Sequence, residues 1–215
     1  MGYPMLRRIT LLMVFWMIVA PTGCGGVKSS GRGGNSNVLE PAYWPRPTFL
    51  TAAEQQTHPG LSVVYASCKI RHIDKMPGRK WMTENGVPGE PIRTIAHQFG
   101  NGEVFGSGKS REVCVQMQGY LNFQESGIYR IKAYSNDGIR VFLDNKMILN
   151  DPEFHAERFT PEAEIDIRQP GRYVVLVRYF QRKGTAALEM HWKTPGADRF
   201  NIIPAMTYSH DSNPT

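Results

Sequence analysis

Two runs of alternating apolar residues, separated by a polar tetrad, constrain the fold of this chain more than any other feature. The runs lie at residues 129–133 and 139–143, and Ser-Asn-Asp-Gly occupies residues 135–138 between them. A period of two is typical of β-strands, and Asn, Asp and Gly tolerate the positive φ of tight hairpin turns. A third apolar run follows at residues 147–149. The stretch therefore predicts a β-meander with a polar, oxygen-rich corner in its middle.

Further strands are predicted on both sides of this stretch. Residues 61–65 indicate the first strand of the domain, and residues 113–117 and 120–123 show two more strand-like patterns. Residues 76–91 are rich in proline and glycine, which predicts a long surface loop. Trp81 lies in that loop, either as a ligand contact or folded back onto the sheet.

Several motifs in a fixed order resemble one known family. SNDG at residues 135–138 and LDNK at residues 143–146 resemble the central block of the PA14 domain, and GRY…RYF at residues 171–180 and ALEMHW at residues 187–192 resemble its later blocks. The resemblance covers residues 60–208. It implies an all-β fold, an antiparallel β-sandwich or barrel, that follows a signal peptide and a flexible tether.

The first 23 residues are expected to be a signal peptide. Arg7 and Arg8 precede an apolar run at residues 9–20, which is shorter than the roughly 20 residues of a membrane-spanning helix. Small residues before Cys24 resemble a bacterial lipobox, which implies a lipid-anchored protein of the cell envelope. Gly25 follows Cys24, and by resemblance to bacterial sorting signals this favours the outer membrane. The alternative is an ordinary secretory signal with an incidental cysteine.

The rest of the chain divides by composition. Residues 24–40 are rich in Gly and Ser and are expected to form a flexible tether, because they have too few apolar side chains to offset the entropy of ordering. A Pro-rich lead-in at residues 41–59 follows, with a short helix expected at residues 51–54. The folded domain is predicted at residues 60–208 and a short tail at residues 209–215.

Charge and motif content favour a binding protein over an enzyme. The formal net charge is +6, but the 25 Lys and Arg residues are interleaved with 19 acidic residues, without the basic stripe of a nucleic-acid-binding protein. The histidines show no zinc-binding spacing, and no Gly-x-Ser-x-Gly elbow occurs. We therefore expect no catalytic residues and no nucleic-acid partner.

The three cysteines suggest a division of roles. With Cys24 assigned to the lipid, Cys68 and Cys114 remain in a domain that is exported to an oxidising compartment. We predict a disulfide between them. The alternative is two free buried thiols.

The corner at Asn136 and Asp137 is the candidate site. In lectin-like PA14 domains two adjacent aspartates at this position, joined by a cis peptide bond, hold a calcium ion that coordinates sugar hydroxyls. Here Asn136 replaces the first aspartate, so the resemblance implies a calcium site with one negative charge fewer. Asn136, Asp137 and Trp81 are the predicted ligand contacts. The alternative is that the corner only turns the chain, with Asp137 in an Asx-turn.

Two functions follow from these expectations. The first is a membrane-anchored, non-catalytic module that binds carbohydrate at the cell envelope, with calcium as its cofactor. The second is a structural or protein-interaction subunit of an envelope assembly that has neither a sugar site nor a metal site. The expected partner is accordingly a glycan or an envelope protein.

Overall fold

The computed structural model describes residues 45–48 and 57–212. The expected signal peptide, Cys24, the expected tether and the helix expected at residues 51–54 lie outside the described residues. None of the helices in the described part of the chain is long and apolar enough to cross a bilayer.

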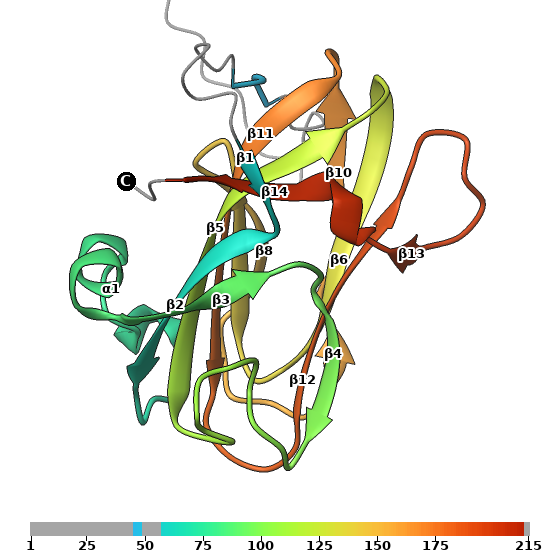
Figure 1. Ribbon diagram of the computed structural model, residues 1–215. Helices are drawn as coiled ribbons and strands as arrows, with labels where there is room; N and C mark the ends of the chain where they lie inside the picture. The colour runs from blue at the N-terminus through green and yellow to red at the C-terminus, as the bar shows by residue number, and fades with distance from the viewer. Residues whose placement is uncertain (1–44, 49–56, 213–215) are drawn as a thin grey trace, which may run out of the picture. The chain divides into compact units, whose positions relative to one another are not determined.

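The described chain forms two antiparallel sheets that pack face to face (Figure 1). The eight-stranded sheet has the order β1 (Thr57–Pro59), β14 (Tyr208–Asp211), β5 (Val113–Phe123), β11 (Gly171–Gln181), β7 (Ile139–Leu143), β8 (Lys146–Asp151), with β2 (Leu61–Ser67) on β5 and β3 (Val87–Ile92) on β2. The six-stranded sheet has the order β10 (Ala163–Ile167), β6 (Gly127–Asn136), β12 (Ala186–Lys193), β13 (Asn201–Ile202), with β4 (Ala96–Gly100) on β12 and β9 (Arg158–Phe159) on β6. The predicted all-β sandwich is thus confirmed.

The core lies between the sheets and is built by strands with period-two burial. In β7 the apolar residues of the alternating run, Ile139, Val141 and Leu143, are all fully buried. An aromatic cluster joins the layers: the ring of Phe123 from β5 lies 4.8 Å from Tyr129 of β6, centroid to centroid. Edge-to-face aromatic pairs of this kind add about 0.5–1.5 kcal/mol beyond the burial of their area.

At the polar tetrad, residues 135–138, the chain passes from one sheet to the other and does not form a hairpin. Asn136, at the end of β6, pairs with Ala187 of β12 in one sheet, whereas Ile139, at the start of β7, pairs with Tyr179 of β11 in the other. The meander prediction is therefore wrong at this position. It is right for the next turn, where β7 and β8 pair and Asp144 and Asn145 have φ of 48° and 62°.

Two other predicted segments differ in detail. Residues 76–91 do not form one loop: they contain the helix α1 (Arg79–Asn85) and most of β3, and they follow directly on the short 3₁₀ helix η1 (Ile73–Lys75). The remaining 3₁₀ helix is η2 (Ala205–Thr207). The two strand patterns predicted at residues 113–117 and 120–123 are one continuous strand, β5, and β1 precedes the strand that was expected to be first.

The predicted disulfide is present. Cys68, just after β2, is bonded to Cys114 of β5. Cys114 is fully buried in a small secondary core on the outer side of the eight-stranded sheet, together with Met82 of α1 and Phe180 of β11. The bond thus ties the end of β2 to the strand on which this secondary core is built.

Candidate functional site

The corner between β6 and β7 is tightly packed. The peptide bond between Asn136 and Asp137 is cis. A Cβ atom at Gly138 would lie 2.5 Å from a ring carbon of Phe180 and 2.9 Å from the carbonyl oxygen of Glu153. Only glycine fits there, because real Cβ atoms do not approach other heavy atoms so closely. The corner is therefore held against β11 and against the segment that follows β8.

The Asp137 carboxylate is fully buried and is held by backbone amides. Its Oδ2 accepts a hydrogen bond from the backbone N–H of Arg182 at 2.7 Å, and its Oδ1 accepts one from the backbone N–H of His155 at 3.3 Å. Burial raises the pKa of the Asp137 carboxyl, and hydrogen bonds from the backbone amides of Arg182, His155 and Lys183 oppose part of that shift.

Asn136 offers an acceptor that nothing in the described chain uses. Its backbone carbonyl accepts a hydrogen bond from the hydroxyl of Tyr179, and its Nδ2 lies 3.5 Å from Oγ1 of Thr185. Its Oδ1 is buried and has no hydrogen-bond partner among the described residues. A buried polar atom without a partner costs about 1–3 kcal/mol. This oxygen is therefore the atom of the corner most ready to take a ligand.

The loop between β11 and β12 forms one wall of the site. The buried side chain of Gln181 donates from Nε2 to the carbonyl oxygens of Lys183 and Thr185, at 3.1 and 3.2 Å. These hydrogen bonds hold the backbone of the loop in place. The Thr185 hydroxyl donates to Oε1 of Glu157 at 2.5 Å. This hydrogen bond, with a further one from the Asn136 side chain, lowers the pKa of the exposed Glu157 carboxyl. A second carboxylate thus lies beside Asn136.

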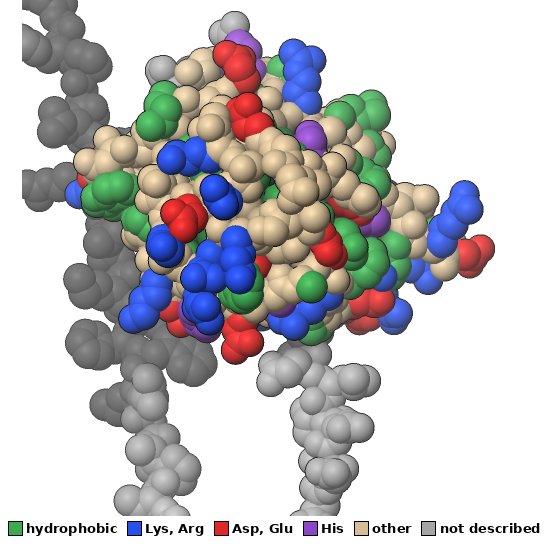
Figure 2. Space-filling view, turned by 90° about the horizontal axis from the view of Figure 1, so that it is seen from below, with side chains coloured by type: hydrophobic (Ala, Val, Ile, Leu, Met, Phe, Trp, Pro, Cys, Tyr) green, Lys and Arg blue, Asp and Glu red, His purple; other side chains and the backbone are tan. Residues whose placement is uncertain are grey.

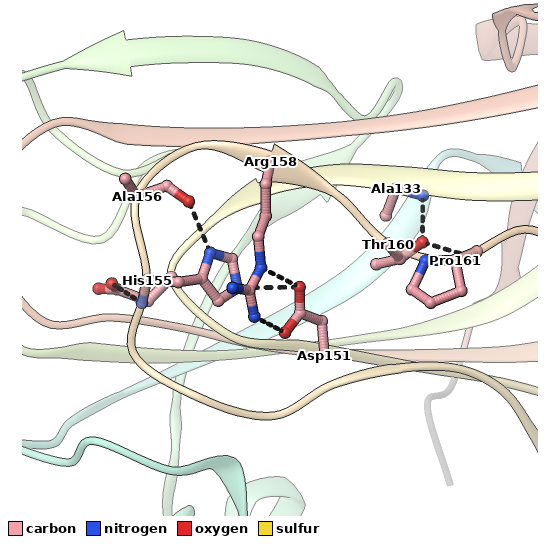
Figure 3. A network of polar contacts seen from close by, with 8 residues as sticks. Ala133, Asp151, His155, Ala156, Arg158, Thr160 and Pro161 are labelled. Atoms are coloured by element: carbon pink, nitrogen blue, oxygen red, sulfur yellow. Dashed lines mark hydrogen bonds and ion pairs between the residues drawn. The ribbon is translucent and has the colours of Figure 1, made fainter.

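An ion-pair network fixes the segment that follows β8 (Figure 3). Arg158 binds the buried Asp151 carboxylate through two nitrogens, at 2.8 and 2.5 Å, and Nε2 of His155 lies 3.3 Å from the same carboxylate. His155 also contacts the carbonyl oxygen of Ala156 through Nδ1, at 2.7 Å. Because the His155 side chain is fixed in this way, its backbone N–H stays directed at Asp137.

The structure brings together only part of the predicted site. Asn136 and Asp137 are adjacent in the corner, but Trp81 lies on α1, which contacts β2, and is 47% exposed. Sequence reasoning missed His155, Arg182 and Thr185, which lie 18, 45 and 49 residues from their corner partners. No local pattern marks these residues, because their backbone and hydroxyl groups reach the corner only through the tertiary fold.

The donor chemistry of the corner fits a hard cation such as calcium. Calcium prefers oxygen ligands, and the corner holds an amide oxygen without a partner, the Asp137 carboxylate and, beside them, Glu157. The described residues contain no group of three or more His, Cys, Asp or Glu side chains arranged for a metal. A calcium ion here would therefore depend on few charged ligands.

These features define the class of the protein: an antiparallel β-sandwich with a polar corner where the chain crosses between its sheets. The chain belongs to the PA14 domain family, whose model matches residues 96–205. No curated protein sequence matches the chain.

Solved structures share the fold at low identity. An anti-sigma factor domain-containing protein superposes with a TM-score of 0.60 and 17% identity over 74% of this chain, which spans 50% of that protein. A PA14 sugar-binding domain from an RTX adhesin gives a TM-score of 0.53 and 16% identity over 71% of this chain and 98% of that domain. The epithelial adhesin 9 A domain from Candida glabrata was solved in complex with Galβ1-4GlcNAc. It superposes with a TM-score of 0.57 and 10% identity over 79% of this chain and 98% of that domain. At these identities the likeness shows the fold alone.

Proposed function

We propose that this chain is a non-catalytic carbohydrate-binding module of the PA14 family whose ligand binds at the Asn136–Asp137 corner. The observation that carries the proposal is the buried Oδ1 of Asn136, which has no partner in the described chain and belongs to the residue that precedes the buried Asp137. Two structures with the same fold are a sugar-binding domain and an adhesin domain bound to a disaccharide, which supports a sugar as the ligand.

Calcium is the cofactor that we propose for the corner. Asn136 and Asp137 would hold the ion, with Glu157 as the nearest further carboxylate. When bound, the ion would supply coordination sites for sugar hydroxyls. The protein's own contribution is rigidity, because the amides of Arg182 and His155 fix the Asp137 carboxylate and Tyr179 fixes the carbonyl of Asn136. With Asn136 in place of an acidic residue, we expect weak binding, with a Kd of about 10⁻⁴–10⁻³ M.

We further propose that the module is held at the outer membrane of the bacterial cell envelope by a lipid on Cys24, with residues 24–40 as its tether. The signal-like segment before Cys24 supports export. A module anchored through such a tether would reach ligands on its own or on a neighbouring surface.

The second candidate function is a structural or protein-interaction subunit of an envelope assembly. The complete burial of Asp137, with both oxygens bonded to backbone amides, favours it, because these contacts alone account for the residue as a turn. On this alternative neither calcium nor sugar binds at the corner.

Thermal unfolding with and without calcium separates the two candidates. We expect millimolar calcium to raise the Tm of the full-length chain in detergent, relative to EDTA, because a ligand of the folded state adds RT ln(1 + [L]/Kd), about 2.7 kcal/mol at 100 times Kd. Asn136→Asp restores a carboxylate and should enlarge the rise at a given calcium concentration, whereas Asp137→Asn should abolish it.

The control is Asn201→Asp, which adds the same charge at an exposed position of β13. Its calcium-dependent rise should equal that of the wild type. If neither the wild type nor Asn136→Asp responds to calcium, the metal proposal is wrong. A glycan array that stays blank for the wild type, with and without calcium, would contradict the carbohydrate proposal itself.

A further inference from the structure

Three basic side chains surround one aromatic ring at the same end of the molecule as the corner. The guanidinium carbons of Arg71 and Arg182 lie 5.7 and 5.3 Å from the ring centroid of Phe154, and Nζ of Lys183 lies 5.6 Å from it. Figure 2, which views the molecule from below, shows a group of Lys and Arg side chains on this end. We call Arg71, Arg182, Lys183 and Phe154 the basic patch.

The basic patch stands on a rigid base. Phe154 packs against the secondary core that contains Cys114 and Phe180, and its backbone N–H donates to the carbonyl oxygen of Arg71 at 2.9 Å. The disulfide at Cys68 ties down the segment that leads to Arg71. The attraction between a cation and the face of an aromatic ring keeps these side chains near the ring.

The cations of the basic patch have no acidic partners in the part of the chain that the structure describes. Among the described residues, the salt bridges include neither Arg71 nor Arg182 nor Lys183. Nη1 of Arg182 is buried and has no hydrogen-bond partner there. The nearby carboxylate of Glu157 accepts from Thr185. Three like charges on one ring repel one another, so an anion that binds among them removes an unfavourable interaction.

The basic patch is continuous with the corner. The backbone N–H of Arg182 donates to the Asp137 carboxylate, and so does that of His155, the residue that follows Phe154. The two segments that hold Asp137 therefore also carry the ring and two of its cations. A ligand seated at the corner would present its neighbouring groups to these side chains.

We propose that the basic patch is a subsite for the carboxylate or sulfate of an acidic sugar, so that the ligand of the corner is an acidic glycan. This inference rests on the proposed carbohydrate-binding function and specifies its ligand class. Arg71 and Arg182 would bind the planar or tetrahedral anion through guanidinium N–H groups, and Lys183 would add a point charge. The anion then satisfies Nη1 of Arg182, which has no partner in the described chain.

Matched pairs of oligosaccharides test the inference. The full-length chain in detergent is titrated, with calcium present, with galacturonate and galactose oligomers, glucuronate and glucose oligomers, and sulfated and unsulfated galactan. We expect the acidic member of at least one pair to bind about 10-fold or more tightly, and this preference to fall as salt screens the charges.

The test variant is Arg71→Gln with Lys183→Gln, since both side chains are exposed and neither is part of the corner. It should lose the preference for the acidic member and keep its affinity for the neutral one. The control is Lys80→Gln with Arg199→Gln, which removes the same charge from exposed positions on α1 and after β12 and should behave as the wild type.

The outcomes separate this inference from the function on which it rests. Equal affinity for both members of every pair, or equal behaviour of the test and control variants, overturns the inference and leaves the carbohydrate function standing. Binding of no oligosaccharide contradicts both. Patch-dependent binding to phosphatidylglycerol vesicles without any preference among sugars also overturns the inference, because the anion would then belong to a lipid surface.

Discussion

Asn136 combines two polar contacts with one acceptor that has no partner in the described chain. Its carbonyl is bonded to Tyr179, its Nδ2 faces Thr185, and its Oδ1 is buried without a partner in the described chain. The sequence alone marks this residue and Asp137, because an Asn-Asp-Gly triplet between apolar runs is a strong local signal. It does not mark Tyr179, whose hydroxyl comes from the opposite sheet.

Tyr179→Phe measures how much the corner depends on that hydroxyl. The fully buried Tyr179 hydroxyl serves the carbonyl of Asn136 and also lies 3.1 Å from Oε1 of Gln181. Its removal leaves buried acceptors without a donor, so we expect a loss of about 1–3 kcal/mol in the free energy of unfolding. Urea denaturation measures the loss.

Tyr134→Phe is the matched control, because Tyr134 is only half-buried and packs its ring against Phe159. We expect it to cost less than about 0.5 kcal/mol, as surface substitutions do. Equal stabilities of Tyr179→Phe and the wild type would show that the hydroxyl does not support the corner.

Strands and turns show where local patterns stop being informative. The alternation in β6 and β7 predicts both strands, but it carries no information on their partners, since any neighbour that covers the apolar face satisfies it. β7 pairs with the long strand β11, so the Asn-Asp-Gly corner crosses between the sheets. Gly78 and Gly86 were interpreted as loop residues, yet they flank α1 and mark its two ends.

The disulfide links two strands covalently, because it joins the end of β2 to β5. It closes a loop with a sequence separation of 46, for which a chain-entropy model gives about 4 kcal/mol of stabilisation. Reduction should therefore lower the urea midpoint of the domain strongly. Cys68→Ala with Cys114→Ala should unfold near the reduced wild type, whether or not reductant is present. Identical midpoints for the oxidised and reduced wild type would contradict this role.

Membrane attachment belongs to the scale of the whole molecule. If Cys24 carries acyl chains, each buried CH₂ contributes about 0.8 kcal/mol, and two or more chains hold a protein stably on a bilayer. We expect the wild type to sediment with membranes after a high-salt wash and to incorporate labelled fatty acid. Cys24→Ser should do neither. A Cys24→Ser protein that still resists the wash would assign the anchor to another part of the chain.

The distribution of charge is also decided at this scale. Along the sequence, Lys and Arg alternate with acidic residues and form no stripe. The fold nevertheless brings Arg71 to within 5.7 Å of the Phe154 ring and Arg182 to within 5.3 Å of it, from segments more than a hundred residues apart. The basic patch could not be predicted from spacing, because Arg71, Phe154 and the Arg182–Lys183 pair come from three separate segments of the chain.

Alternating apolar residues indicate the all-β class, and the turn residues mark the position of the corner, because both signals act within a few residues. The cysteine count indicates the Cys68–Cys114 pairing only once Cys24 is set aside, since three cysteines allow three pairings. Only the tertiary structure decided that β6 and β7 lie in different sheets, that Trp81 lies on a helix, and which residues surround Asp137. The physical reason is that strand partners and side-chain neighbours are chosen by the packing of the whole core, where many long-range contacts are satisfied together.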